Sequence, residues 1–149
     1  MAEKKSAKGG STSGEENNKD KKFNSKILLV EDDKMLADMY ITKFTKEGLE
    51  VMRAEDGAEG LEMAQKHKPD LILLDIIMPK LDGFAVLREL KRDKGNSNMH
   101  ILLLTNLGQS EDVEKGKELG ADDYFIKANH TPAEIVEKVK YMLTNINQK

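Results

Sequence analysis

Three short, continuously apolar runs constrain most strongly what this chain can fold into. They read ILLV at 27–30, LILL at 71–74 and ILLL at 101–104, and stretches of helical periodicity separate them. A strand without polar alternation needs cover on both faces of its sheet, and the alternation of such strands with helices is typical of βα units and a parallel sheet. The sequence therefore predicts an α/β domain with a parallel sheet between two layers of helices.

Two more mixed runs complete the predicted sheet, LEVMRA at 49–54 and DYFI at 123–126. Their polar content suits strands at the two edges. Because right-handed crossovers then put the three apolar runs inside, we predict a flavodoxin-like, doubly wound (βα)5 fold with a five-stranded parallel sheet in the order 2-1-3-4-5. Helical periodicity predicts the intervening helices at 33–47, 57–67, 83–94, 108–119 and 131–145.

The N-terminal segment has a different composition. Residues 1–26 carry seven Lys against four acidic side chains, with Phe23 as the only large apolar residue after Met1. Such a segment cannot bury enough apolar surface to offset its ordering entropy, so we expect a disordered N-terminal tail at 1–26 and one folded domain at 27–149. That domain holds 17 basic and 23 acidic side chains, the totals of 24 and 27 less the tail's 7 and 4, so its net charge is −6.

Composition excludes several classes of protein. The chain has no Cys, which rules out a disulfide framework, a thiolate metal site and a thiol nucleophile. Its apolar runs are far shorter than the ~20 residues of a membrane helix, and no apolar segment follows the N-terminal lysines as in a signal peptide. We therefore expect a cytoplasmic protein with no membrane span.

Polar side chains stand directly after the predicted strands: Glu31 and Asp32 after the first, Asp75 after the third, Thr105 after the fourth and Lys127 after the fifth. In doubly wound sheets ligands bind beyond the carboxyl ends of the strands, here between strands one and three. Three carboxylates gathered there need a cation or a proton to offset their repulsion. Oxygen ligands with room left for water and phosphate favour Mg²⁺, so we predict a magnesium site at Glu31, Asp32 and Asp75.

The same groups suit phosphoryl transfer to a carboxylate. Asp75 would attack phosphorus, the metal and Lys127 would neutralise phosphoryl oxygens, and Thr105 would bond another oxygen, which gives an acyl phosphate. A single Asp at a strand end is more commonly a turn or cap residue. The placement of five matched polar residues at the ends of the right strands favours the functional interpretation.

At these positions the chain resembles the receiver domain of two-component response regulators. The resemblance covers residues 27 to about 146 and rests on ILLVEDD at 27–33, LILLDIIMPKLDG at 71–83, LLLTN at 102–106 and GADDYFIK at 120–127. It implies that Asp75 is the phospho-acceptor, with Lys127 and Thr105 as catalytic partners. It also implies that Glu31, Asp32, Asp75 and the backbone carbonyl of Ile77 hold Mg²⁺, with Asp33 just beyond the acidic pair, and that Thr105 and Tyr124 are the switch residues.

The resemblance also implies the partners. The phosphoryl donor would be a histidine kinase or a histidine phosphotransfer protein, and the receiver would catalyse only its own phosphorylation and dephosphorylation, without being an enzyme for another substrate. Thr105 would move toward the phosphoryl group and Tyr124 would turn inward, which alters the surface made by 108–119, 123–126 and 131–145. A downstream protein target would read that surface. A homodimer could form through the same surface. It would use the charged side chains of Lys115, Asp122, Asp123, Glu134 and Lys138, which could equally form a solvated face.

Because the sequence ends at the last predicted helix, we expect a stand-alone receiver without a DNA-binding domain. Two alternatives stay open: a phosphorelay intermediate that passes its phosphoryl group to a histidine phosphotransfer protein, and a pseudo-receiver that only binds partners. An aspartate-nucleophile phosphatase would need a second carboxylate two residues after the nucleophile, where Ile77 stands.

The sequence departs from the family pattern at two positions. Ala128 follows Lys127 where the family usually has a proline joined by a cis peptide, so we expect either a trans peptide with a rearranged loop or a costly cis bond. Asn106 stands where the family usually has a small residue. In addition, Ile77 and Leu107 are apolar two residues beyond Asp75 and Thr105, from where they would shield the phosphoryl group from water, so we predict a long-lived aspartyl phosphate.

Overall fold

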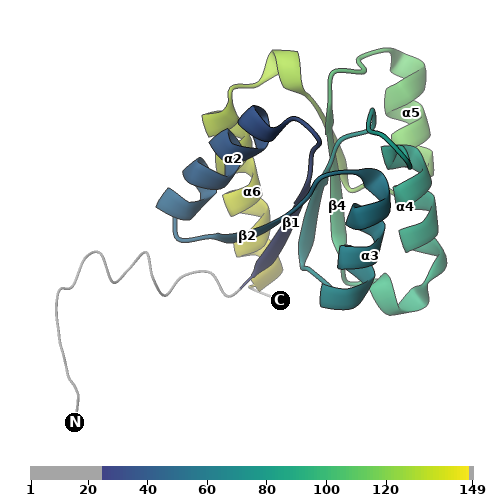
Figure 1. Cartoon of the computed structure of the whole chain (residues 1–149), viewed down its shortest axis with the longest axis horizontal. Helices are drawn as coiled ribbons and strands as arrows, with labels where there is room; N and C mark the ends of the chain where they lie inside the picture. The colour runs from purple at the N-terminus through teal and green to yellow at the C-terminus, as the bar shows by residue number, and fades with distance from the viewer. Residues whose placement is uncertain (1–24, 148–149) are drawn as a thin grey trace, which may run out of the picture.

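The sheet has the predicted topology. The computed structural model describes residues 25–147 and contains five parallel strands in the order β2-β1-β3-β4-β5 (Figure 1). The strands are β1 (Lys26–Val30), β2 (Glu50–Ala54), β3 (Leu71–Leu74), β4 (His100–Thr105) and β5 (Asp123–Ile126). Val30 lies opposite Leu74, and Leu74 lies opposite Leu103, so the central strands end at nearly the same level. The polar residues that follow them are thereby brought to one edge of the sheet.

Helices cover both faces of this sheet. α2 (Lys34–Lys46) and α6 (Pro132–Asn147) lie on one face, and α3 (Gly57–His67), α4 (Gly83–Arg92) and α5 (Ser110–Glu118) lie on the other (Figure 1). Ile27 and Leu29 belong to the core on the first face, whereas Leu28 and Val30 belong to the core on the second. This division explains why β1, β3 and β4 show no polar alternation: both sides of each strand are buried.

Two predicted helices, at 83–94 and 108–119, each have one end two residues inside the predicted one, and the helix predicted at 33–47 is shorter by one residue at each end. The helix expected at 83–94 ends at Arg92 because Asp93 adopts an extended conformation (φ −90°, ψ 113°) and its carboxylate accepts from Gly95 N, which opens a short 3-10 turn, η1 (Lys94–Asn96). The helix expected from 108 begins at Ser110, and Gln109 before it supplies no side-chain cap. The cap at Asp93, which periodicity does not register, decides the end of α4. At the start of α5 the extended backbone of Gln109 (φ −69°, ψ 147°) sets the boundary.

The loop after β5 resolves the question raised by Ala128. Residues 25–147 contain no cis peptide bond, so the Lys127–Ala128 peptide is trans. Lys127–Asn129 form a 3-10 turn, η2, and α6 follows it with a capping box in which Glu134 N donates to Thr131 Oγ1 and Thr131 N donates to Glu134 Oε1. Of the two expected isomers of this peptide, the trans form is thus the one found.

The expected tail at 1–26 lies outside the described residues except for its last two. Ser25 is buried and Lys26 opens β1, so the fold starts slightly before the predicted boundary at 27. Within the part of the chain that the structure describes, no helix is both long and apolar enough to cross a membrane.

Candidate functional site

Three carboxylates meet at the edge of the sheet where β1 and β3 end. Glu31, Asp32 and Asp75 each present an oxygen, and these oxygens lie within 4.8 Å of one another. Glu31 and Asp75 are buried, with 2% and 7% of their surface exposed, whereas Asp32 is exposed. Two of the three charges have therefore lost most of their water, and protein groups must compensate them.

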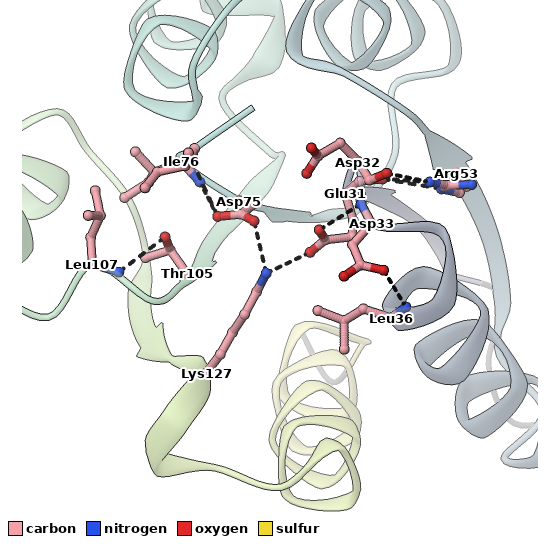
Figure 2. A network of polar contacts seen from close by, with 11 residues as sticks. Glu31, Asp32, Asp33, Leu36, Arg53, Asp75, Ile76, Thr105, Leu107 and Lys127 are labelled. Carbon is pink, nitrogen blue, oxygen red and sulfur yellow. Dashed lines mark hydrogen bonds and ion pairs between the residues drawn. The ribbon is translucent and has the colours of Figure 1, made fainter. Parts of the chain in front are cut away.

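Lys127 supplies that compensation. Its side chain extends from the end of β5 into the cluster, where Nζ lies 2.8 Å from Glu31 Oε1 and 2.8 Å from Asp75 Oδ2 (Figure 2). The Lys127 side chain is 13% exposed, so both ion pairs are shielded from solvent. A single ammonium faces three carboxylates, which leaves the cluster with an excess of negative charge.

The pKa values of Glu31 and Lys127 reflect the opposing effects of burial and of their ion pairs. Burial raises the pKa of Glu31, and the hydrogen bond from Lys127 opposes the rise without cancelling it. Burial alone would lower the pKa of Lys127, but its hydrogen bonds to Asp75 and Glu31 outweigh burial and raise that pKa. The ammonium therefore stays charged, and the remaining negative charge is available to a cation.

The Asp75 carboxylate is fixed by its own loop. Oδ1 accepts from Ile76 N at 2.7 Å and from Ile77 N at 3.4 Å, while Oδ2 faces Lys127 (Figure 2). Gly83 N, at the start of α4, donates to Ile76 O, and a Cβ on Gly83 would lie 2.3 Å from Asp75 O. The first turn of α4 is thus packed directly against the backbone of Asp75.

Asp33, the third acidic residue after β1, has a structural role. Its Oδ1 accepts from Leu36 N at 3.1 Å and caps α2, and its own N–H donates to Glu31 Oε2. The cap directs the Asp33 carboxylate to the helix N-terminus, while the Asp32 carboxylate belongs to the acidic cluster.

The two expected switch residues belong to one network beside the site. Thr105 is fully buried, and its Oγ1 accepts from Leu107 N within its own loop. The Tyr124 hydroxyl donates to Leu107 O, and its ring lies next to Gly116 on α5. Burial, reinforced by the negative charges of Asp112 and Asp75, raises the pKa of Tyr124 to about 12. The N–H of Leu107 therefore bonds to Thr105 and its C=O bonds to Tyr124, so Leu107 links the two residues.

The residues expected to shield the site lie in its loops. Ile77 is 61% exposed, Asn106 is also exposed, and Leu107 is partly buried against the core under α3 and α4. The binding of Mg²⁺ by the backbone carbonyl of Ile77, two residues after Asp75, stays a prediction.

Several charges expected on the partner surface have partners inside the molecule. Lys115 Nζ lies 4.6 Å from the centroid of the Phe84 ring, and Lys138 Nζ lies 5.6 Å from that of Phe125. Asp122 Oδ2 accepts from Ile101 N, and Glu134 belongs to the capping box of α6. Each of these residues has a role within one chain, and a dimer through them stays a prediction.

Arg53 of β2 is a site residue that the sequence analysis did not identify. Its Nε and Nη2 donate to Glu31 O at 3.2 and 2.9 Å, and Nη2 also approaches Asp32 O at 3.4 Å (Figure 2). The signal was a long cationic side chain inside the mixed edge strand β2, where only Ala54 is buried. Its target is backbone, however, and no motif marks a backbone carbonyl.

The donor set fits a hard divalent cation. Carboxylate oxygens from three residues converge, their charge exceeds that of Lys127, and the exposed Asp32 leaves one side open to water and substrate. These are the ligands and the openness that Mg²⁺ prefers in phosphoryl-transfer sites.

Comparisons with known proteins agree with this geometry. The family model described as response regulator receiver domain matches residues 27–140. The transcriptional regulatory protein PhoP of Bacillus subtilis is 40% identical over 121 residues, which are 81% of this chain and 49% of PhoP. The DNA-binding regulator RpaA of Synechocystis is 40% identical over 102 residues, 68% of this chain and 42% of RpaA. The chain thus spans about half the length of these curated relatives or somewhat less.

Solved structures share the fold over nearly their whole length. The receiver domain of Francisella response regulator 1452 aligns with a TM-score of 0.75 and 32% identity, covering 82% of this chain and 98% of that one. A CheY-like receiver domain protein of Methanospirillum hungatei gives a TM-score of 0.75 and 29% identity over 83% of this chain and 97% of that one. On the family match, the relatives and the shared fold, this chain belongs to the response regulator receiver domain family.

Proposed function

We propose that this receiver domain accepts a phosphoryl group on Asp75 from a phosphohistidine protein, in a reaction that requires Mg²⁺. The phosphohistidine belongs to a histidine kinase or a histidine phosphotransfer protein. The observation that carries the proposal is the position of Lys127 Nζ, 2.8 Å from both Glu31 and Asp75, at the edge where the three carboxylates converge. A buried ammonium beside a nucleophilic carboxylate and an acidic cluster is the arrangement that phosphoryl transfer to aspartate requires.

Each residue has a defined part in the transfer. An Asp75 oxygen forms a bond to phosphorus as the bond from phosphorus to the histidine nitrogen breaks, and the nitrogen keeps that electron pair. The hydrogen bond from Ile76 N to Oδ1 orients the carboxylate. Lys127 neutralises charge on a phosphoryl oxygen, and Thr105 donates to another. Glu31, Asp32, Asp75 and the Ile77 carbonyl would hold Mg²⁺, which when bound would supply further neutralisation of phosphoryl charge.

The new phosphoryl group adds about −1.5 to −2 charges and strong acceptors, so it favours the state that offers it more donors. Thr105 is poised to be such a donor, because its Oγ1 accepts a long hydrogen bond from Leu107 N, at 3.4 Å, and this bond does not use the hydroxyl proton. Tyr124 bonds to the carbonyl of the same Leu107. A shift of this loop therefore reaches Tyr124 and the surface of α5, β5 and α6, where a downstream protein, or a second copy of the chain, would bind.

The domain is proposed to act in the cytoplasm and to catalyse only its own phosphorylation and dephosphorylation. PhoP and RpaA, which are named as transcriptional regulators, are about twice as long as the matched region. The proposal includes that the phosphorylated domain acts by binding a separate partner protein.

The test is incubation with acetyl phosphate and Mg²⁺, followed by intact mass. The unaltered protein is expected to gain the mass of one phosphoryl group, and Asp75→Ala and the unaltered protein in EDTA are expected to gain none. A protein that stays unmodified with acetyl phosphate and with a phosphorylated histidine donor would be a pseudo-receiver, which would overturn the proposal.

A further inference from the structure

Arg53 occupies an unusual environment for a cation. It lies on the edge strand β2 opposite Leu29, and its side chain is only 16% exposed. Among the described residues it forms an ion pair with Glu55, whose Oε2 lies 4.0 Å away on a side chain that is 73% exposed. Its shorter contacts are to backbone carbonyls, so this largely buried charge is directed mainly at the main chain.

Those carbonyls belong to the two acidic residues after β1. Nε and Nη2 both donate to Glu31 O, at 3.2 and 2.9 Å, and Nη2 also approaches Asp32 O at 3.4 Å. The Glu31 N–H donates to the carbonyl of Ala54, the residue after Arg53, at 3.1 Å. Residue 31 is therefore held through both its N–H and its C=O by β2.

The hydrogen bonds from Arg53 affect the direction in which the side chains of Glu31 and Asp32 point. Figure 2 shows the carboxylate of Asp32 pointing away from Arg53 and toward the side where Asp75 lies. Because the peptide unit is planar, fixing the carbonyls of Glu31 and Asp32 limits the rotations that carry their side chains. Asp32 has particular need of such support, since its side chain is exposed whereas Glu31 is also held by Lys127.

We propose that Arg53 is a positioning residue that holds the Glu31–Asp32 turn in the geometry that binds Mg²⁺. The inference rests on the proposed function. Arginine suits the role because its planar fork places two N–H groups on one oxygen, which the single ammonium of lysine does not reproduce.

Charge and geometry make opposite predictions, so they can be separated. A positive charge beside the site repels Mg²⁺, and its removal by itself would strengthen binding. Loss of the fork would loosen the turn and weaken binding. Arg53→Lys keeps the charge and loses the fork, whereas Arg53→Gln loses both. Arg92→Gln is the matched control, because Arg92 is exposed on α4 and pairs with Glu89 on its own helix.

The experiment is calorimetric titration of Mg²⁺ into the unaltered protein, Arg53→Lys, Arg53→Gln and Arg92→Gln, well below their unfolding temperatures. Outer-shell partners of metal ligands typically contribute about 10-fold or more to metal affinity, so Arg53→Lys is expected to bind Mg²⁺ about 10-fold more weakly. Arg53→Gln is expected to lose less affinity than Arg53→Lys, because removal of the repelling charge offsets part of the loss. Arg92→Gln is expected to bind like the unaltered protein.

A second readout separates positioning from a purely structural role. In acetyl phosphate reactions, the half-saturating Mg²⁺ concentration of Arg53→Lys should rise by the same factor of about 10 while the rate at saturating Mg²⁺ changes little. A structural role alone would lower the thermal midpoint and leave the half-saturating concentration unchanged. If the unaltered protein binds Mg²⁺ and Arg53→Lys binds it with the same affinity, the proposed role of Arg53 is overturned while the proposed function stands. Absence of Mg²⁺ binding by the unaltered protein would overturn the proposed function as well.

Discussion

Gly83 couples the start of α4 to the phospho-acceptor, and Gly83→Ala measures that coupling. An added Cβ would lie 2.3 Å from Asp75 O and 2.7 Å from Ile76 Cα. Ordinary contacts begin at 3.4 Å, so the start of α4 and the backbone of Asp75 would have to separate by about 1.1 Å, the difference between 3.4 and 2.3. Both obstacles are backbone atoms, which cannot rotate away as a side chain can.

Two effects of known size follow from this displacement. Overpacking of a well-packed site costs about 1–3 kcal/mol, and backbone obstacles favour the upper part of that range. Displacement of a reacting group by about 1 Å can lower a rate about 100-fold. We therefore expect Gly83→Ala to lose about 2–3 kcal/mol of unfolding free energy and about 100-fold in the rate of phosphorylation by acetyl phosphate.

Urea unfolding followed by circular dichroism gives the first quantity, and intact mass against time gives the second. Gly95→Ala is the control, because its Cβ would meet only the Asp93 side chain, at 3.1 Å. That variant is expected to stay within about 0.5 kcal/mol of the unaltered protein and to be phosphorylated normally. If Gly83→Ala behaved like this control, the close packing of α4 on Asp75 would have no bearing on the site.

Three further predictions concern the metal, the switch and the lifetime. Mg²⁺ at 100 times its dissociation constant should stabilise the protein by about 2.7 kcal/mol. Asp32→Asn should lose most of this gain, whereas Glu89→Gln, which pairs with Arg92 on the surface of α4, should keep it. Equal thermal shifts in both variants would refute the site. Because the pKa of Tyr124 is raised to about 12, the unfolded chain, with tyrosine pKa near 10, loses its proton first, so stability should fall as pH rises from about 10 to 12. Tyr124→Phe should lose that share of the fall, which unfolding at a series of pH values would reveal; an unchanged slope would contradict the assignment. Ile77→Asn should shorten the lifetime of the aspartyl phosphate, followed by the decay of the phosphorylated mass, and a half-life of seconds in the unaltered protein would count against shielding by Ile77 and Leu107.

The order of the strands was predictable because a strand that is buried on both faces has an apolar residue at nearly every position. The runs that became β1, β3 and β4 are apolar at every position except Lys26, which opens β1 at the rim of the sheet, and His100 and Thr105, at the two ends of β4. Once the order is known, parallel register brings the residues after the strands to one edge. Glu31, Asp75 and Lys127 could therefore be placed together from the amino-acid sequence alone, and their contacts confirm that placement.

The remaining features depend on contacts that no sequence period encodes. Arg53 acts on carbonyl groups, which every residue possesses, and Lys115 turns toward the ring of Phe84 although a charge on a helix usually indicates a solvated face. The end of α4 depends on one cap at Asp93, and the loop after Lys127 adopts a 3-10 turn with a trans peptide where the family pattern suggested proline.

The most direct test of the account is chemical identification of the modified residue. An aspartyl phosphate is an acyl phosphate, which borohydride reduces to homoserine, whereas phosphate esters of Ser, Thr or Tyr do not react in this way. After treatment with acetyl phosphate and Mg²⁺, then borohydride and peptide mass mapping, we predict homoserine at position 75 and unchanged aspartate at positions 32 and 33, with no conversion when Mg²⁺ is removed. An intact Asp75 in a protein that carries the phosphoryl mass, or conversion at another carboxylate, would contradict the central claim.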